Sequence, residues 1–229
     1  MVPPPFQESP LSLADLLRET EPSLSTIAAH LDGLSPDERL AETRTLDRGL
    51  QRRLYRAAEK AEPLTLDDFV PPGTPPRVQV IHDGRNTLPL PGGLKLFQKR
   101  FARPDVSHDG AASGPKPRAP AEPRGDRLFG YNQSPFISTI GPGFYVAVPT
   151  AGNPAWEGRG AVVVDYFQIP DGPVPDGWPK VIPNTKGLQT FVYNRTRDFM
   201  RGVSAHVTIG AAYKVETALD HYFVLVRED

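Results

Sequence analysis

The chain has 229 residues, a formal net charge of −1, 27 prolines and no cysteine. The lack of cysteine excludes disulfides and thiolate metal sites and fits a reducing compartment, so we predict a cytoplasmic protein. The balanced charge, and apolar runs far shorter than the ~20 residues that span a bilayer, give no reason to expect nucleic acid or a membrane as a partner.

The first segment, residues 1–62, is predicted to be helical from about residue 11. Ser12 and Asp15 form a weak capping box, and Gly33 is placed to end a second short helix. The strongest start signal is the run Ser35-Pro36-Asp37-Glu38, which offers a capping serine, a proline at the first helical position and a glutamate two residues later. From there leucines recur at helical spacing, and we expect one helix to about residue 60.

The second segment, residues 63–102, is predicted to connect the helices to the rest of the chain. Residues 77–82 are typical of a short strand, whereas Leu94, Phe97 and Phe101 fall on one face of a short helix. Residues 103–126 hold five prolines and almost no apolar side chains. This composition predicts a disordered linker.

The last segment, residues 127–229, is predicted to form a C-terminal domain. Residues 143–149 and 161–169 indicate strands that could pair through the loop around Asn153. Apolar residues from 188 to 199 favour a helix, and residues 203–209 and 222–226 alternate as two strands of a hairpin.

The order of these elements predicts an α+β fold, in which N-terminal helices precede an antiparallel sheet ordered strand-strand-helix-strand-strand. A sheet curled around a ligand cavity would share the same pattern and is the alternative. We expect all segments to form one folded unit, because about 50 residues of short helices would be marginally stable alone.

Four blocks of sequence resemble a bacterial protein family of unknown function. The resemblance implies a bacterial origin and a single folded unit that includes the N-terminal helices. It implies no activity, cofactor or catalytic residue. The blocks are Leu128-Phe129-Gly130-Tyr131-Asn132, Gly141-Pro142-Gly143-Phe144-Tyr145-Val146, Met200-Arg201-Gly202-Val203-Ser204-Ala205-His206-Val207 and Tyr222-Phe223-Val224-Leu225-Val226-Arg227-Glu228.

Motifs for common catalytic and cofactor chemistry are absent from the sequence. It contains neither phosphate-binding glycine pattern, no G-x-S-x-G and no H-E-x-x-H, so we predict no cofactor, no metal site and no assignable catalytic residue. Ser204 and His206 would share one face of a strand, but neighbours at that spacing are usually too far apart for a catalytic pair.

The candidate site is a set of polar residues within or beside otherwise apolar strands. If one face of the sheet lines a cavity, these side chains could converge there, and a buried carboxylate near a histidine would have a perturbed pKa. The alternative is a sheet with one wet face, on which polar residues point outward without a shared role. The candidate ligand-binding residues are Tyr145, Asp165, Tyr166, Arg201, His206 and His221.

These observations predict a non-catalytic binding protein that holds a small, partly apolar ligand in the C-terminal domain. One alternative is a structural or scaffold protein that contacts a protein partner, forms a homo-oligomer or joins a larger bacterial assembly. A third hypothesis is an enzyme that uses Asp165 or His206 as a general base.

Overall fold

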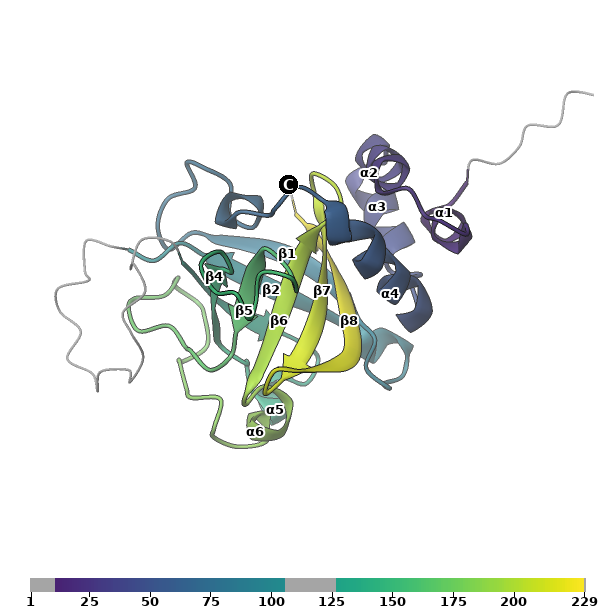
Figure 1. Cartoon of the computed structure of the whole chain (residues 1–229). Helices are drawn as coiled ribbons and strands as arrows, with labels where there is room; N and C mark the ends of the chain where they lie inside the picture. The colour runs from purple at the N-terminus through teal and green to yellow at the C-terminus, as the bar shows by residue number, and fades with distance from the viewer. Residues whose placement is uncertain (1–10, 106–126, 229) are drawn as a thin grey trace, which may run out of the picture.

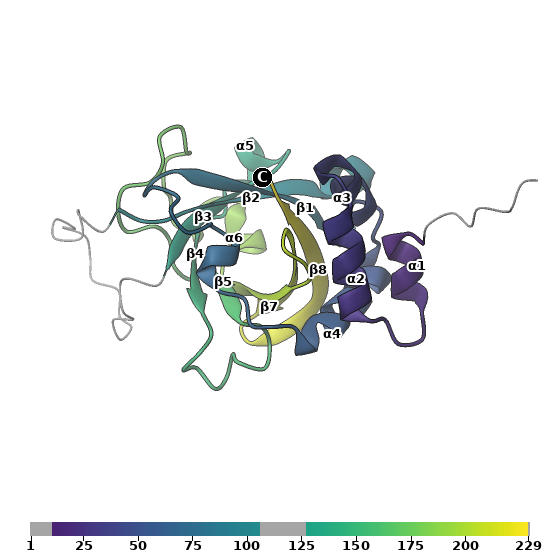
Figure 2. The same cartoon turned by 90° about the horizontal axis from the view of Figure 1, so that it is seen from above.

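The fold is a closed β-barrel in the computed structural model, which describes residues 11–105 and 127–228. Within these residues, eight antiparallel strands each pair with the next along the chain, and β8 pairs with β1. Figure 1 shows the barrel from the side, and Figure 2 shows it from above as a ring. The strands are β1 (Gln79–Asn86), β2 (Leu96–Ala102), β3 (Leu128–Gln133), β4 (Tyr145–Pro149), β5 (Val162–Asp165), β6 (Thr196–Gly202), β7 (Val207–Lys214) and β8 (Thr217–Arg227).

The α+β prediction is therefore wrong. The sheet does surround an interior, but it has eight strands where the prediction has four. The helix predicted between the two pairs of strands is reduced to Gln189–Val192, because the chain from Thr196 onward belongs to β6. The helices lie outside the barrel or at one of its ends (Figure 1). They are α1 (Leu13–Arg18), α2 (Leu24–Gly33), α3 (Pro36–Thr43), α4 (Arg48–Ala57), α5 (Ile137–Ile140) and α6 (Gln189–Val192).

Three of the strands were not expected from the sequence. Residues 96–102 and 196–202 form β2 and β6 where helices were predicted, and β3 was not assigned. Phe97 and Phe101 are four residues apart, which places them on one face of a helix. The same separation also places them on one face of a strand, in which every second side chain points inward. The predicted strands near β1, β4, β5, β7 and β8 are confirmed, as are the pairings of β4 with β5 and of β7 with β8. The predicted linker lies, from residue 106 to 126, outside the described residues.

The four N-terminal helices cover one side of the barrel. The predicted capping box at Ser12 and the predicted capping serine at Ser35 are present at the starts of α1 and α3. The single helix predicted from Ser35 is instead two, because the chain turns after Thr43 and Asp47 caps α4. Arg85 of β1 donates to the carbonyl oxygen of Leu46 at 3.0 Å, which stabilises this turn.

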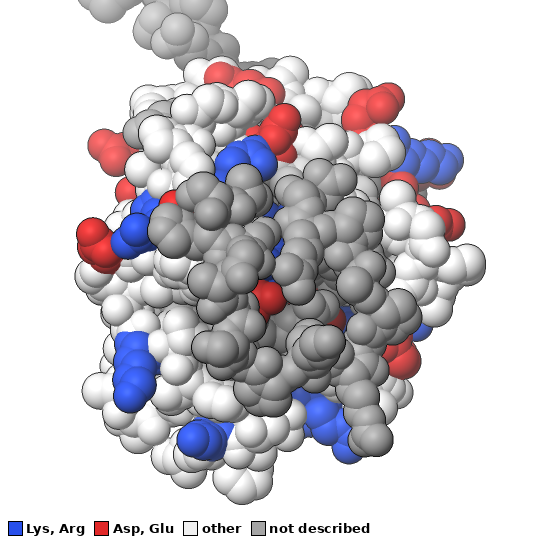
Figure 3. All heavy atoms as spheres, turned by 90° about the vertical axis from the view of Figure 1, so that its left-hand side faces the viewer, with Lys and Arg blue, Asp and Glu red and all other residues white. Residues whose placement is uncertain are grey.

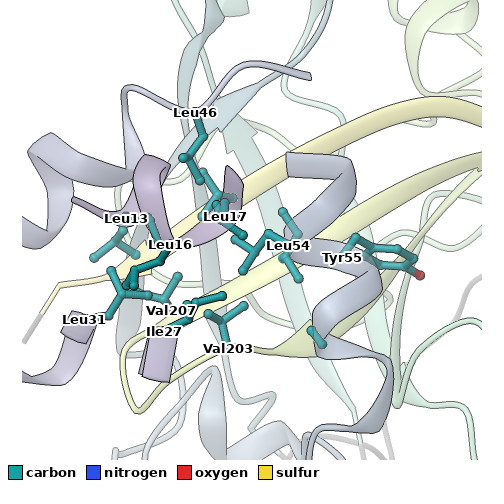
Figure 4. Packing of buried hydrophobic residues seen from close by; sticks show 14 of the residues in the cluster. Leu13, Leu16, Leu17, Ile27, Leu31, Leu46, Leu54, Tyr55, Val203 and Val207 are labelled. Carbon is teal, nitrogen blue, oxygen red and sulfur yellow. The ribbon is translucent and has the colours of Figure 1, made fainter. Parts of the chain in front are cut away.

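Leucine and isoleucine side chains of α1, α2 and α4 pack on the outer face of β7 and β8 (Figure 4). They bury a continuous apolar cluster that lies outside the barrel wall, separate from the core inside it. The helices thus stabilise one side of the barrel without entering it. The residues of this cluster that Figure 4 labels are Leu13, Leu16, Leu17, Ile27, Leu31, Leu46, Leu54, Tyr55, Val203 and Val207.

The barrel interior has two different ends. Because each strand runs antiparallel to the one before it, successive connections alternate between the ends. The mouth end carries the connections β1–β2, β3–β4, β5–β6 and β7–β8, with α5 and α6 among them. The closed end carries the segment before β1 and the connections β4–β5 and β6–β7.

The closed end is filled by the segment that precedes β1. A 3-10 turn at Leu66–Asp68 is followed by Phe69, which is fully buried in the interior core with Phe101. Two inward-facing side chains hold this segment. His82 Nε2 donates to the carbonyl oxygen of Phe69 at 2.9 Å, and Arg227 donates to the carbonyl oxygen of Asp68 at 2.8 Å.

Three glycines make room for large rings inside the barrel. Gly84 lies opposite Phe97, and Gly130 lies opposite Tyr145 on the neighbouring strand. Gly210 and Phe223 are the third such pair. A Cβ atom at any of these glycines would collide with the facing ring. Aromatic side chains that lie across glycines fill much of the barrel, as expected for a barrel of only eight strands.

Candidate functional site

The mouth end of the barrel contains a cavity of about 460 Å³. Its outer walls are mostly apolar and come from the connections between strands. They include Leu88, Leu90 and Leu94 of the β1–β2 connection, and Phe136 and Ile140 of the β3–β4 connection. A second hollow of about 520 Å³ lies near the closed end, but no buried charged side chain lines it within the described residues.

Four buried polar side chains, here called the polar quartet, line the inner part of this cavity. They are Lys99 of β2, Asn132 of β3, Tyr166 directly after β5 and Asp198 of β6. The Lys99 ammonium donates to Asp198 Oδ2 at 3.1 Å, to Asn132 Oδ1 at 3.1 Å and to the Tyr166 hydroxyl at 2.5 Å. All three N–H groups of this lysine therefore have acceptors within the quartet.

Aromatic rings surround the Lys99 ammonium on the sides that the quartet leaves. Its Nζ atom lies 4.8 Å from the ring centre of Tyr145, 5.0 Å from that of Tyr166 and 4.9 Å from that of Phe223. Ring faces attract a cation, and the attraction is larger where water is excluded. These rings partly replace the hydration that Lys99, at 1% exposure, has lost.

Burial acts in opposite directions on the two charged members of the quartet. Burial disfavours the charged form of each group, so it lowers the pKa of Lys99 and raises the pKa of Asp198. The opposite charge of the partner counteracts both shifts. Three acceptors around one ammonium favour the charged pair, since such a pair is stable in an apolar interior only when its hydrogen bonds are complete.

Three of the predicted site residues face the barrel interior. Tyr166 belongs to the polar quartet, and Tyr145 lies behind Lys99 with its hydroxyl 3.2 Å from the carbonyl oxygen of Arg100. His221 of β8 lines the cavity wall, paired with Ala212 of β7. Burial, with a contribution from Arg48, lowers the pKa of His221. It therefore favours the neutral imidazole.

The structure does not place the other three predicted residues in this cavity. Asp165 points to the outer face of the barrel, where Arg197 Nε lies 3.3 Å from its Oδ1 atom. Arg201 donates to the carbonyl oxygen of Tyr55 at 2.8 Å and so joins β6 to α4. His206 lies in the β6–β7 connection at the closed end.

Sequence reasoning missed Lys99, Asn132 and Asp198. The signal that could have found Lys99 is its position between Phe97 and Phe101, which share its face in a strand. Asp198 likewise shares its face of a strand with the apolar Met200, although Thr196 on its other side is polar. A charged residue at an inward position is costly unless it is paired, so two such positions indicate an internal ion pair.

The surface charges give no dominant sign on the face shown in Figure 3. Basic and acidic side chains are interspersed on the described part of that face. Within residues 11–105 and 127–228, no helix is both long and apolar enough to cross a membrane. The same residues contain no group of three histidine, aspartate or glutamate side chains that could hold a metal ion.

The chain forms a closed, eight-stranded antiparallel barrel with a cavity at one end. No family model matches the sequence, and no curated protein or solved structure is significantly similar to it. The resemblance of the four sequence blocks therefore stays a prediction. An eight-stranded barrel is compatible with a ligand-binding protein, because barrels of this size either fill their interior or hold one small ligand.

Proposed function

We propose that the protein binds a small, partly apolar ligand inside the mouth end of the barrel. The apolar part of the ligand lies among the leucine and aromatic side chains of the outer wall, and its polar group contacts the polar quartet. One observation carries this proposal: a cavity with mostly apolar walls ends at four buried, hydrogen-bonded polar side chains.

The size and polarity of the cavity support a small-molecule ligand. Its volume of about 460 Å³ lies within the range of roughly 300–1,000 Å³ that is typical of such sites. Sites of this kind combine apolar walls with a few fixed polar groups that orient the ligand. The polar quartet matches this description, since each of its members is bonded to another one.

Binding is favoured over catalysis by the hydrogen bonds within the quartet. A nucleophile or general base needs a reactive atom that is free to reach the substrate. Lys99 has all its N–H groups bonded to neighbours. Asp165 and His206, the two general bases of the enzyme hypothesis, lie on the outer face and at the closed end.

A cavity-filling substitution tests the proposal. Ala212 lines the cavity between Asp198 and His221, so Ala212→Trp would occupy the space of the ligand. The measurement is the fluorescence of N-phenyl-1-naphthylamine, a neutral apolar probe that brightens when it leaves water. We expect saturable binding to the wild-type chain and at least about tenfold weaker binding to Ala212→Trp, which corresponds to ~1.4 kcal/mol or more.

The matched control is Ala155→Trp in the exposed β4–β5 connection at the closed end. This variant adds the same side chain far from the mouth and should bind the probe as the wild type does. Thermal unfolding of each variant shows that it is folded before binding is compared. Lack of saturable binding by the wild type, or equal binding by both variants, would contradict the proposal.

A further inference from the structure

The polar quartet has no hydrogen-bond donor left for a ligand. The Lys99 ammonium has three acceptors within the quartet. The Asn132 amide nitrogen donates to the carbonyl oxygen of Gly143 at 3.0 Å and lies 3.1 Å from the Tyr166 hydroxyl. That hydroxyl in turn lies 3.1 Å from Asp198 Oδ2. The donors of the quartet are thus directed at one another or at the backbone.

One strong acceptor of the quartet is left over. Asp198 Oδ2 accepts from Lys99 and from Tyr166, but no donor among the described residues reaches Asp198 Oδ1. The side chain of Asp198 keeps 9% of its surface exposed, and Asp198 is part of the cavity lining. Asp198 therefore contributes to the cavity lining a carboxylate oxygen to which no described residue donates.

The neighbouring polar group adds to this acceptor character. Thr196, one inward position closer to the mouth on β6, also lines the cavity. Its hydroxyl donates to the carbonyl oxygen of Tyr193 at 2.6 Å, so only the lone pairs of Thr196 Oγ1 remain for a ligand. On this side of the cavity, two side chains on one strand present oxygen acceptors.

We infer that the polar group of the ligand is a neutral hydrogen-bond donor, namely a hydroxyl group on an apolar body. This inference rests on the proposed function. A hydroxyl donates to Asp198 Oδ1 and requires no donor from the quartet. It also brings no net charge to a quartet in which the charges of Lys99 and Asp198 already balance.

Charged head groups fit this site less well. A ligand carboxylate would meet the free oxygen of Asp198 with like charge, and the Lys99 ammonium that would attract it is already fully bonded. A ligand ammonium would be attracted by Asp198 but repelled by Lys99. It would also lose its hydration in a mostly apolar cavity, which is costly for a charge without a partner of its own.

A series of ligands with one tail and three head groups tests this inference. Decan-1-ol, decanoate and decylamine share ten carbons and differ in the group that would contact Asp198. Each is used to displace N-phenyl-1-naphthylamine from the wild-type chain at pH 7.5. We expect decan-1-ol to displace the probe at about tenfold lower concentration than either charged ligand, because decanoate meets the like charge of Asp198 and decylamine loses its hydration beside Lys99.

Two variants show whether Asp198 causes the preference. Asp198→Asn removes the charge at nearly the same size, and we expect it to narrow the gap between decan-1-ol and decanoate. The matched control is Asp165→Asn on the outer face of the barrel, which should leave the ranking unchanged. If Asp198→Asn does not fold, the ranking measured on the wild-type chain alone decides the inference.

The outcomes separate this inference from the proposed function. If the wild-type chain does not bind the apolar probe, the proposed function fails and the inference falls with it. If the probe binds but decanoate or decylamine displaces it as well as decan-1-ol does, or no ligand of the series displaces it, only the hydroxyl inference is overturned.

Discussion

The two ends of the barrel interior bury polar side chains in different ways. At the closed end, His82 and Arg227 donate to backbone carbonyl oxygens of the segment that fills the barrel. At the mouth end, Lys99 and Asp198 form an ion pair that tyrosine and asparagine side chains complete. One set of polar groups holds the chain itself, whereas the other surrounds a cavity.

This difference shows how one small barrel can be both stable and open. The closed end has aromatic packing around His82, with the rings of Phe69 and Phe101 next to its imidazole. The mouth end gives up such packing for about 460 Å³ of space, and its charged pair depends on hydrogen bonds instead. Substitutions at the two ends should therefore differ in what they cost and in what they do to binding.

The largest effect is expected from Lys99→Met. This substitution leaves the Asp198 carboxylate buried without its counter-ion, and breaking a buried pair in this way costs about 3–5 kcal/mol. The double variant Lys99→Met/Asp198→Leu removes both charges, and we expect it to recover most of that loss, because an apolar pair of similar size is often tolerated. Denaturant unfolding of both variants and the wild type measures the difference.

An exposed ion pair provides the control for this prediction. Arg52 donates to Asp220 at 2.9 Å on the surface, where water screens the charges. Arg52→Met should therefore change the free energy of unfolding little. If Lys99→Met costs no more than the double variant does, the buried pair is not what stabilises the mouth end.

The next effect concerns the closed end and depends on pH. Burial lowers the pKa of His82 to about 4, with Arg227 adding to this shift and the hydrogen bond to Phe69 opposing it. In the unfolded chain the pKa of histidine is about 6.5. Between these two values the unfolded chain binds a proton that the folded chain does not, so stability falls as the pH falls from about 6.5 to 4. The expected loss is about 3 kcal/mol.

The variant His82→Gln isolates this contribution. Its amide can still donate to the Phe69 carbonyl oxygen but does not titrate. We expect the free energy of unfolding of the variant to fall by about 3 kcal/mol less than that of the wild type over the same pH window. Asp165 and Asp198, whose pKa values burial raises, titrate in both proteins and cancel in the comparison. Parallel pH curves would mean that His82 is not buried as a neutral group.

The sequence predicts the parts of the fold that local signals specify. The caps at Ser12 and Ser35 lie next to the helices that they start, and the strands β4, β5, β7 and β8 have runs of β-branched or alternating apolar residues. The turn between α3 and α4 escaped prediction because Arg85, about forty residues later, donates to the carbonyl oxygens of Arg44 and Leu46 in it. Closure of β8 onto β1 likewise joins strands more than 130 residues apart.

The three strands that were not predicted, β2, β3 and β6, hold three of the four residues of the polar quartet. Lys99, Asn132 and Asp198 lie at inward positions of β2, β3 and β6, where an ordinary strand would have apolar side chains. Each of these polar residues breaks the alternation that marks a strand. In β2, the remaining Phe97 and Phe101 then show the spacing of a helix. The polar residues of the site thus prevented these strands from being recognised in the sequence. Such failures are expected at functional sites, where residues depart from the usual pattern of their secondary structure.

The smallest of the expected effects lies between the two ends, at Gly210. A Cβ atom at this position would collide with the ring of Phe223, which lines the cavity and lies against Lys99. We expect Gly210→Ala to displace that ring and to lower the free energy of unfolding by about 1–3 kcal/mol, as overpacking does. The displaced ring should also weaken binding of N-phenyl-1-naphthylamine at the mouth end.

Three further variants, namely Phe223→Leu, the double variant and a control, show whether the ring is the cause. In Gly210→Ala/Phe223→Leu the smaller side chain makes room for the added methyl group, so the two substitutions should cost less together than the sum of their separate costs. Gly33→Ala, at the end of α2 with no atom within 4 Å of the added Cβ, is the control and should change stability by less than ~1 kcal/mol. Additive costs for Gly210→Ala and Phe223→Leu would show that the ring of Phe223 is not the reason for glycine at position 210. Coupled costs with weakened probe binding would show that one ring sets both the packing of the barrel and the depth of its cavity.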